Sequence, residues 1–86
     1  MEPPDPADVL EETRRWIAEF LHTEPASITS EEPLANGLLD SIGLLTLASY
    51  LEERYGIAVS AADAREGEFD TLHALTEFVV RRAGLA

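Results

Sequence analysis

Apolar residues recur at steps of three and four in three separate stretches of this chain, and this repeat limits the possible fold more than any other feature. The stretches lie in residues 6–22, in residues 41–55 and after residue 70. Steps of three and four place apolar side chains on one face of a helix, whereas a half-buried strand alternates every second residue. No stretch shows that alternation. The sequence therefore predicts an all-α fold with three main helices.

Residues with strong preferences for helix ends bound these stretches. Side chains with an oxygen acceptor are favoured at the first position of a helix, and proline and glycine are favoured near its end. The candidate N-caps are Asp5, Asp40 or Ser41, Ser60, and Asp70 or Thr71. The predicted breaks are Pro25, Gly56 and Gly84. Ser60 precedes only a short helical segment near 61–66, so the expected fold is a bundle of three main helices plus one short helix.

The chain length sets the number of domains. A chain of 86 residues can bury one modest core, so we expect a single domain over 1–86 with a loose, proline-rich N-terminus at 1–5. An enclosed active site with its own substrate cavity is not expected at this size. Residues 23–40 form a long connection, and long ordered loops in small domains are often functional. Four apolar residues are expected to attach it to the core: Ile28, Leu34, Leu38 and Leu39.

Charge and composition exclude several functions. The net charge is -11, which repels nucleic acid and anionic membrane surfaces and attracts basic protein surfaces. All basic residues are arginine, so no lysine can form a Schiff base, and no cysteine can act as a nucleophile or zinc ligand. The N-terminus lacks the pattern of a signal peptide, and no apolar run is long enough to span a membrane. We expect a cytoplasmic protein, a monomer when alone, without a metal site.

The dipeptide Asp40-Ser41 lies at the start of an uncharged stretch, because no residue in 41–51 carries a charge. Ser41 could be a helix N-cap, because serine is common there, and Asp40 could do the same. A hydroxyl at a helix N-terminus is also well placed to carry a phosphate, since free N–H groups and the helix dipole favour an anion there. The local pattern leaves both interpretations open.

Apolar side chains also point away from the expected core near the start of this helix. At 100° per residue, the core-facing positions are Leu44, Leu47, Ala48, Leu51 and Tyr55. The outward positions are Ile42, Gly43, Thr46, Ser49 and Glu53, and Leu45 lies beside them. Outward apolar residues offer a contact to a partner that docks beside Ser41.

The segment GLLDSIGLLTLASYLEERYGI resembles the phosphopantetheine attachment region of carrier proteins, which include acyl, peptidyl and D-alanyl carrier proteins. In that family an Asp-Ser step opens the second helix, and a run of the form Leu-x-x-x-Leu-Glu-Glu-x-(Phe or Tyr)-Gly-(Ile or Val) closes it. The matching residues here are Asp40, Ser41, Leu47, Leu51, Glu52, Glu53, Tyr55, Gly56 and Ile57. Further matches are Pro33, Leu34, Phe69 and Thr71, so the resemblance extends over about 7–82.

The resemblance implies a role without catalysis by the chain itself. A phosphopantetheinyl transferase would move 4′-phosphopantetheine from coenzyme A onto Ser41, with Asp40 beside it. The thiol of that group would hold an acyl or aminoacyl cargo as a thioester. A loading ligase or acyltransferase and downstream acceptor enzymes would be the partners. The expected contacts for these enzymes are Ile42, Leu45, Ser49 and Glu53.

Departures from the pattern of fatty-acid carriers narrow the type of carrier protein that we expect. Gly37 lies four residues before Ser41 rather than three, and the outward positions of the second helix carry few charges. The Asn-Gly-Leu-Leu-Asp-Ser stretch at 36–41 looks more like D-alanyl and stand-alone aminoacyl or peptidyl carriers. The resulting hypothesis is a discrete carrier of an amino acid or unusual acyl starter in secondary metabolism, such as polyketide, nonribosomal peptide or antibiotic biosynthesis.

Several alternatives accompany this hypothesis. An acidic helical adaptor that docks a partner helix through Ile42 and Leu45 would need no prosthetic group. An enzyme would need a base, a nucleophile and a pocket, which the sequence does not offer.

Other residues have simpler expected roles. Trp16 and Phe20 are expected in the core, or as the lining for a buried acyl chain. His22 is expected at the surface, Ser30, Glu31 and Glu32 in a solvated turn, and Arg81 and Arg82 at the negative end of the last helix.

Overall fold

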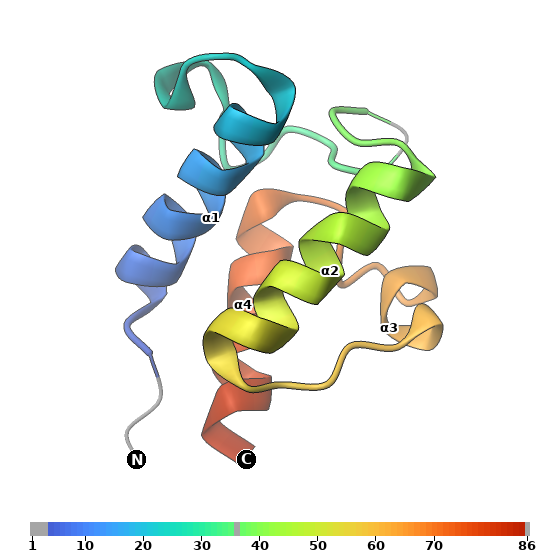
Figure 1. Cartoon of the computed structure of the whole chain (residues 1–86). Coiled ribbons are helices and arrows are strands. Elements are labelled where there is room, and N and C mark those ends of the chain that lie inside the picture. The colour runs from blue at the N-terminus through green and yellow to red at the C-terminus, as the bar shows by residue number, and fades with distance from the viewer. Residues whose placement is uncertain (1–3, 36, 86) are drawn as a thin grey trace.

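The computed structural model describes residues 4–35 and 37–85 and confirms the all-α class (Figure 1). Three helices are long and one is short, as predicted. Their bounds are α1 Pro6–Leu21, α2 Ser41–Tyr55, α3 Ala61–Arg65 and α4 Leu72–Leu85. A single 3₁₀ turn, η1 Pro25–Ser27, was not predicted from the sequence. It begins at the proline that ends the first helical stretch.

The three long helices form a small bundle in which α1 and α2 both pack on α4 (Figure 1). The short helix α3 lies to one side, between α2 and α4 in the chain. The segment between α1 and α2 crosses one end of the bundle, so the beginning of α2 lies at that end. The beginning of α1 and the end of α4 lie at the opposite end. Ser41 is therefore far from both ends of the described chain.

The predicted N-caps of three helices are confirmed. The Asp5 carboxylate accepts from the Ala7 amide at 2.9 Å, so within the predicted loose segment 1–5 this residue already orders α1, while residues 1–3 lie outside the described part. Ser60 and Asp63 form a reciprocal capping box at α3. The hydroxyl of Thr71, rather than the Asp70 carboxylate, accepts from Ala74 at 3.1 Å and caps α4.

The helix C-termini agree less closely with the predictions. Gly56 has a left-handed backbone at φ 66° and closes α2 as predicted. The first helix ends at Leu21, one residue before the predicted end, because the backbone of His22 takes the left-handed conformation, φ 57°. The His22 side chain is exposed, as predicted. Gly84 does not end the last helix, since α4 continues to Leu85. A difference of one residue is ordinary at a fraying helix end.

A single core joins the three long helices, the long connection and the segments on either side of α3. Its buried apolar members are Val9, Ile17, Ala18, Ile28, Leu34, Leu39, Leu47, Leu51, Ile57, Phe69, Leu72, Leu75, Phe78 and Val79. The rings of Phe69 and Phe78 meet edge to face, with centroids 5.8 Å apart. Three of the four loop residues predicted to reach the core are buried, and the fourth, Leu38, is half-buried. The prediction that this connection is attached to the core is confirmed.

The arginines at the end of α4 do more than face the negative end of the helix dipole. Arg82 donates to the carbonyl oxygen of Ala58 at 2.9 Å and to the Asp63 carboxylate at 3.1 Å, and Arg81 pairs with Glu68. Hydrogen bonds from the Ser60 backbone amide and from Arg82 lower the pKa of the Asp63 carboxyl. The long arginine side chains reach back to α3 and its flanking loops, so they tether this segment to α4 in addition to the predicted placement of Arg82 in the last turn of the helix.

Two leucines of α2 test which face of this helix packs on the core and which face is exposed. Leu47 is fully buried, whereas the Leu45 residue is 71% exposed. We expect Leu47→Ala to lower the free energy of unfolding by about 2–5 kcal/mol, because it removes buried methyl groups and leaves a cavity. The matched variant Leu45→Ala should change it by less than about 0.5 kcal/mol. Urea denaturation followed by circular dichroism measures both, and equal losses would contradict the assigned faces.

Candidate functional site

Asp40 is the N-cap of α2, and Ser41 is the first residue inside the helix. The backbone of Asp40 is extended, at φ -87° and ψ -174°, and its carboxylate accepts from the Gly43 amide at 2.8 Å. Its carbonyl oxygen accepts from the Leu44 amide at 2.9 Å, which begins the helix. The interpretation of Ser41 as the N-cap is therefore wrong. The carboxylate takes that role and leaves the neighbouring hydroxyl free for another one.

Ser41 is exposed at the positive end of α2. Among the described residues, no hydrogen bond uses its hydroxyl, and none uses the backbone amides of Ser41 and Ile42. A shallow pocket of about 340 Å³ opens beside it, lined by Gly37, Leu39, Asp40, Ser41 and Leu44. Free amides and the helix dipole favour an anionic group on this hydroxyl. The residues present thus fit a phosphodiester at Ser41.

The connection before α2 is held in place on both sides. The Leu34 amide donates to the Asp70 carbonyl oxygen at 2.8 Å, and the Leu39 amide donates to the Leu34 carbonyl oxygen at 2.9 Å. Gly37 is required for a close approach, since a Cβ there would lie 2.3 Å from the carbonyl oxygen of Pro33. Asn36 lies outside the described residues. These contacts fix the direction from which the chain enters α2.

The outward surface of α2 is apolar near Ser41. Ile42 and Leu45 are each 71% exposed, and Ser49 and Glu53 are exposed further along the helix. Gly43, which the helical repeat placed outward, is buried instead. It is covered by the side chains of Phe20, from the end of α1, and of Leu39, from the connection, and the periodicity of a single helix cannot reveal such contacts. The four residues predicted to contact partners, Ile42, Leu45, Ser49 and Glu53, are all exposed.

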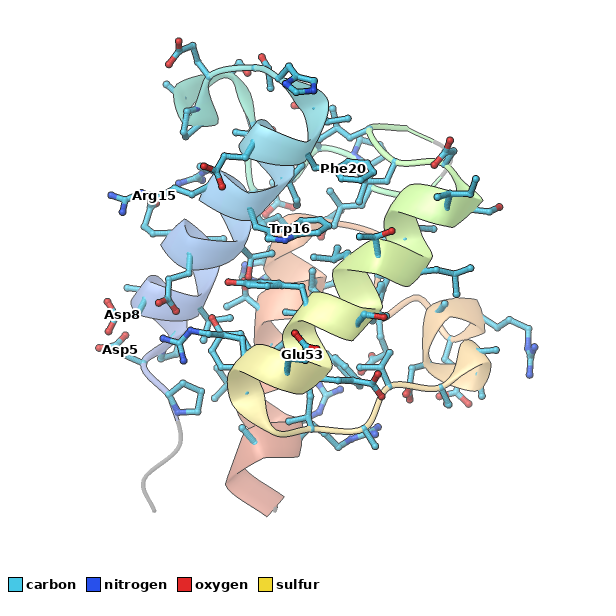
Figure 2. All side chains as sticks on the ribbon, viewed as in Figure 1. Asp5, Asp8, Arg15, Trp16, Phe20 and Glu53 are labelled. Carbon is cyan, nitrogen blue, oxygen red and sulfur yellow. The ribbon has the colours of Figure 1, made fainter. Side chains whose placement is uncertain are left out.

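An aromatic stack lies between α1 and α2, and two of its members, Trp16 and Phe20, were predicted to lie in the core. The Trp16 ring is stacked with Phe20 on one side and with Tyr50 on the other, each at a centroid distance of 5.3 Å. Trp16 is half-buried, but Phe20 is 40% exposed. Figure 2 shows both rings reaching from α1 toward the N-terminal half of α2. The expectation that Phe20 belongs to the core is therefore corrected: it lies at the rim.

A second cavity lies at the opposite end of the bundle and contains no part of the Ser41 site. Its volume is about 710 Å³, and it lies beside Asp5 and Asp8, which Figure 2 labels. Hydrogen bonds from Arg54 and Tyr55 lower the pKa of the Glu12 carboxyl in its wall. Burial and the bond to Glu12 raise the pKa of Tyr55. These bonds, of 2.7 and 2.8 Å, join α1 to the end of α2.

No group of three histidine, aspartate or glutamate residues in the described part of the chain could hold a metal ion, including the turn at Ser30, Glu31 and Glu32. No helix in that part of the chain is both long and apolar enough to cross a membrane.

The family model described as the phosphopantetheine attachment site matches residues 11–79. This match covers most of the chain, so the protein belongs to the family of phosphopantetheine-dependent carrier proteins. Members of this family are non-catalytic carriers that bear covalently attached 4′-phosphopantetheine. They generally interact with a phosphopantetheinyl transferase and with partner enzymes. No curated protein matches the sequence.

The role of Asp40 as the cap can be tested by stability. Asp40→Ala should lower the free energy of unfolding by about 1 kcal/mol, because the Gly43 amide loses its acceptor. Asp40→Asn keeps a side-chain oxygen at the same position and should retain most of the stability. Urea denaturation at neutral pH measures both, and an Asp40→Asn variant as unstable as Asp40→Ala would contradict the capping role.

Proposed function

We propose that Ser41 is the attachment serine for 4′-phosphopantetheine. The observation that carries this proposal is the division of roles at the start of α2. Asp40 caps the helix, so the Ser41 hydroxyl is exposed and free at the positive helix end. The pocket beside it gives a transferase access, and Ser41 lies within the residues that the family model matches.

The attachment is a phosphoryl-group transfer catalysed by a separate enzyme. The Ser41 oxygen forms a bond to the phosphorus of coenzyme A that carries the pantetheine arm. The bond from this phosphorus to the adenosine bisphosphate breaks, and that group leaves. The serine proton passes to a base of the transferase. The attached arm supplies the thiol that the cysteine-free chain lacks and can hold a cargo as a thioester.

We further propose that the cargo is an amino acid or an unusual acyl starter and that the pathway is one of secondary metabolism, such as polyketide or nonribosomal peptide biosynthesis. The support is the Asn-Gly-Leu-Leu-Asp-Ser stretch and the small number of charges on the outward surface of α2. The protein would act in the cytoplasm as a monomer that meets each enzyme in turn. A ligase or acyltransferase would load it, and an acceptor enzyme would unload it.

Partner enzymes would dock on the outward surface formed by Ile42, Leu45, Ser49 and Glu53. Two of these residues are apolar and largely exposed, and they lie within one turn of Ser41. Glu53 would contribute an ion pair with a basic residue of the partner. Because apolar contact dominates this surface, binding should depend only modestly on salt. The same patch supports the second candidate function, an adaptor that docks a partner helix without a prosthetic group.

Intact-protein mass after incubation with coenzyme A and a broad-specificity phosphopantetheinyl transferase tests the attachment. We expect the mass of the protein to rise by one phosphopantetheine group. Ser41→Ala should show no gain, since it removes the only atom to which we assign the transfer, whereas Ser30→Ala, at a serine of the loop between α1 and α2, should be modified fully. If the folded protein gains no mass with an active transferase, the proposal fails and the adaptor function is favoured.

The docking surface can be tested with the same transferase. The double variant Ile42→Ala/Leu45→Ala should lower kcat/KM for modification by roughly tenfold, equivalent to about 1.4 kcal/mol of lost contact. Glu77→Ala, an exposed change on α4, serves as the control and should leave the rate unchanged. Circular dichroism verifies that both variants are folded. An unchanged rate for the double variant would exclude this patch as the contact for the transferase.

A further inference from the structure

The aromatic stack between α1 and α2 ends close to the Asp40-Ser41 step. Tyr50, Trp16 and Phe20 lie in one series of nearly parallel rings, with interplanar angles of 19° and 10°. Phe20 is at the end of the series and is the member with the greatest exposure. A partly exposed ring at the end of a stack leaves apolar, aromatic surface in contact with water.

Gly43 brings this ring next to the helix cap. A Cβ at Gly43 would lie 3.2 Å from Cε2 of Phe20 and 3.3 Å from Oδ1 of Asp40. Because glycine has no side chain, the edge of the Phe20 ring and the cap carboxylate both approach the same point of α2. An aromatic surface and an exposed negative charge are therefore neighbours, and the proposed attachment residue directly follows Asp40.

We propose that the cargo on the arm is an aromatic aminoacyl group that folds back onto this position. This inference rests on the attachment of phosphopantetheine to Ser41. The ring of the cargo packs against the exposed part of Phe20 and extends the aromatic series. Its free α-ammonium group lies near the Asp40 carboxylate, in a protein whose net charge of -11 already attracts cations. An aliphatic aminoacyl cargo could make only the contact with Asp40. An aromatic acyl group without an amine could make only the contact with Phe20.

Physical chemistry favours this occupant over a purely apolar one. Aromatic rings prefer other aromatic rings in stacked or edge-to-face geometry, and a single exposed Phe20 offers little area to a branched aliphatic chain. The interaction with Asp40 is weak because the carboxylate is exposed to solvent. The contact is therefore reversible. A carrier requires this, since the cargo must leave the surface to enter the next enzyme.

The test uses the full chain loaded through a broad-specificity transferase with three coenzyme A derivatives in which a stable amide replaces the thioester. The cargoes are phenylalanyl, 3-phenylpropanoyl and leucyl groups, and the unacylated phosphopantetheine form is the reference. Intact mass first establishes that each sample is loaded. Nuclear magnetic resonance then records the amide shift of Gly43 and the contacts between cargo protons and the Phe20 ring. Phe20→Leu removes the ring, and Glu77→Ala is the control at an exposed position on α4, outside the stack and the docking surface.

We expect the phenylalanyl form to show contacts with Phe20 and the largest shift of the Gly43 amide. The phenylpropanoyl form should show weaker contacts, and the leucyl form none. Phe20→Leu should abolish the difference between cargoes, and Glu77→Ala should preserve it. Equal responses from phenylalanyl and leucyl, or from phenylalanyl and phenylpropanoyl, would overturn the proposal, as would contacts to another surface. A sample that gains no mass instead contradicts the attachment at Ser41.

Discussion

The hydrogen bond from the Gly43 amide to the Asp40 carboxylate is the contact on which the site depends. It satisfies an amide at the beginning of α2 and fixes the helix start at Ser41. With the cap supplied by the preceding residue, the serine hydroxyl is left without an internal role. A serine that served as the cap would have its oxygen engaged by the backbone and would be a poorer acceptor for a transferred group.

The long connection keeps this helix end in a fixed place. Leu34 and Leu39 anchor it in the core, and backbone hydrogen bonds link it to the beginning of α4. A loop attached at several points has little freedom to cover Ser41. Under the proposed function, this end of the bundle presents the arm, and partner enzymes dock on the apolar surface of α2. In this proposed arrangement the folded chain fixes the attachment point, and the length of the arm lets the cargo move from one enzyme to the next.

The sequence predicted the helices well because each carries a strong periodic pattern and a recognisable cap. It also predicted that Ile42 and Leu45 face outward, since their angular positions lie away from Leu47 and Leu51. It failed where a second helix decides the outcome. Gly43 is buried because the side chains of Phe20, from the end of α1, and of Leu39, from the connection, cover it, and Phe20 itself lies at the rim of the core. Arg82 reaches α3 for a similar reason: its partners, Ala58 and Asp63, are distant in sequence.

The sequence by itself determined the helical class, the Asp-Ser step before an uncharged helix and the resemblance to carrier proteins. These are local properties, carried by residue type and by spacing within one segment. Only the tertiary structure decided that Asp40 rather than Ser41 is the cap, and that Phe20, Gly43 and Asp40 meet beside the proposed attachment residue. The first depends on the backbone angles with which the anchored loop enters α2. The second depends on the packing of α1 against α2, because contacts between segments distant in sequence leave no periodic signal in either one.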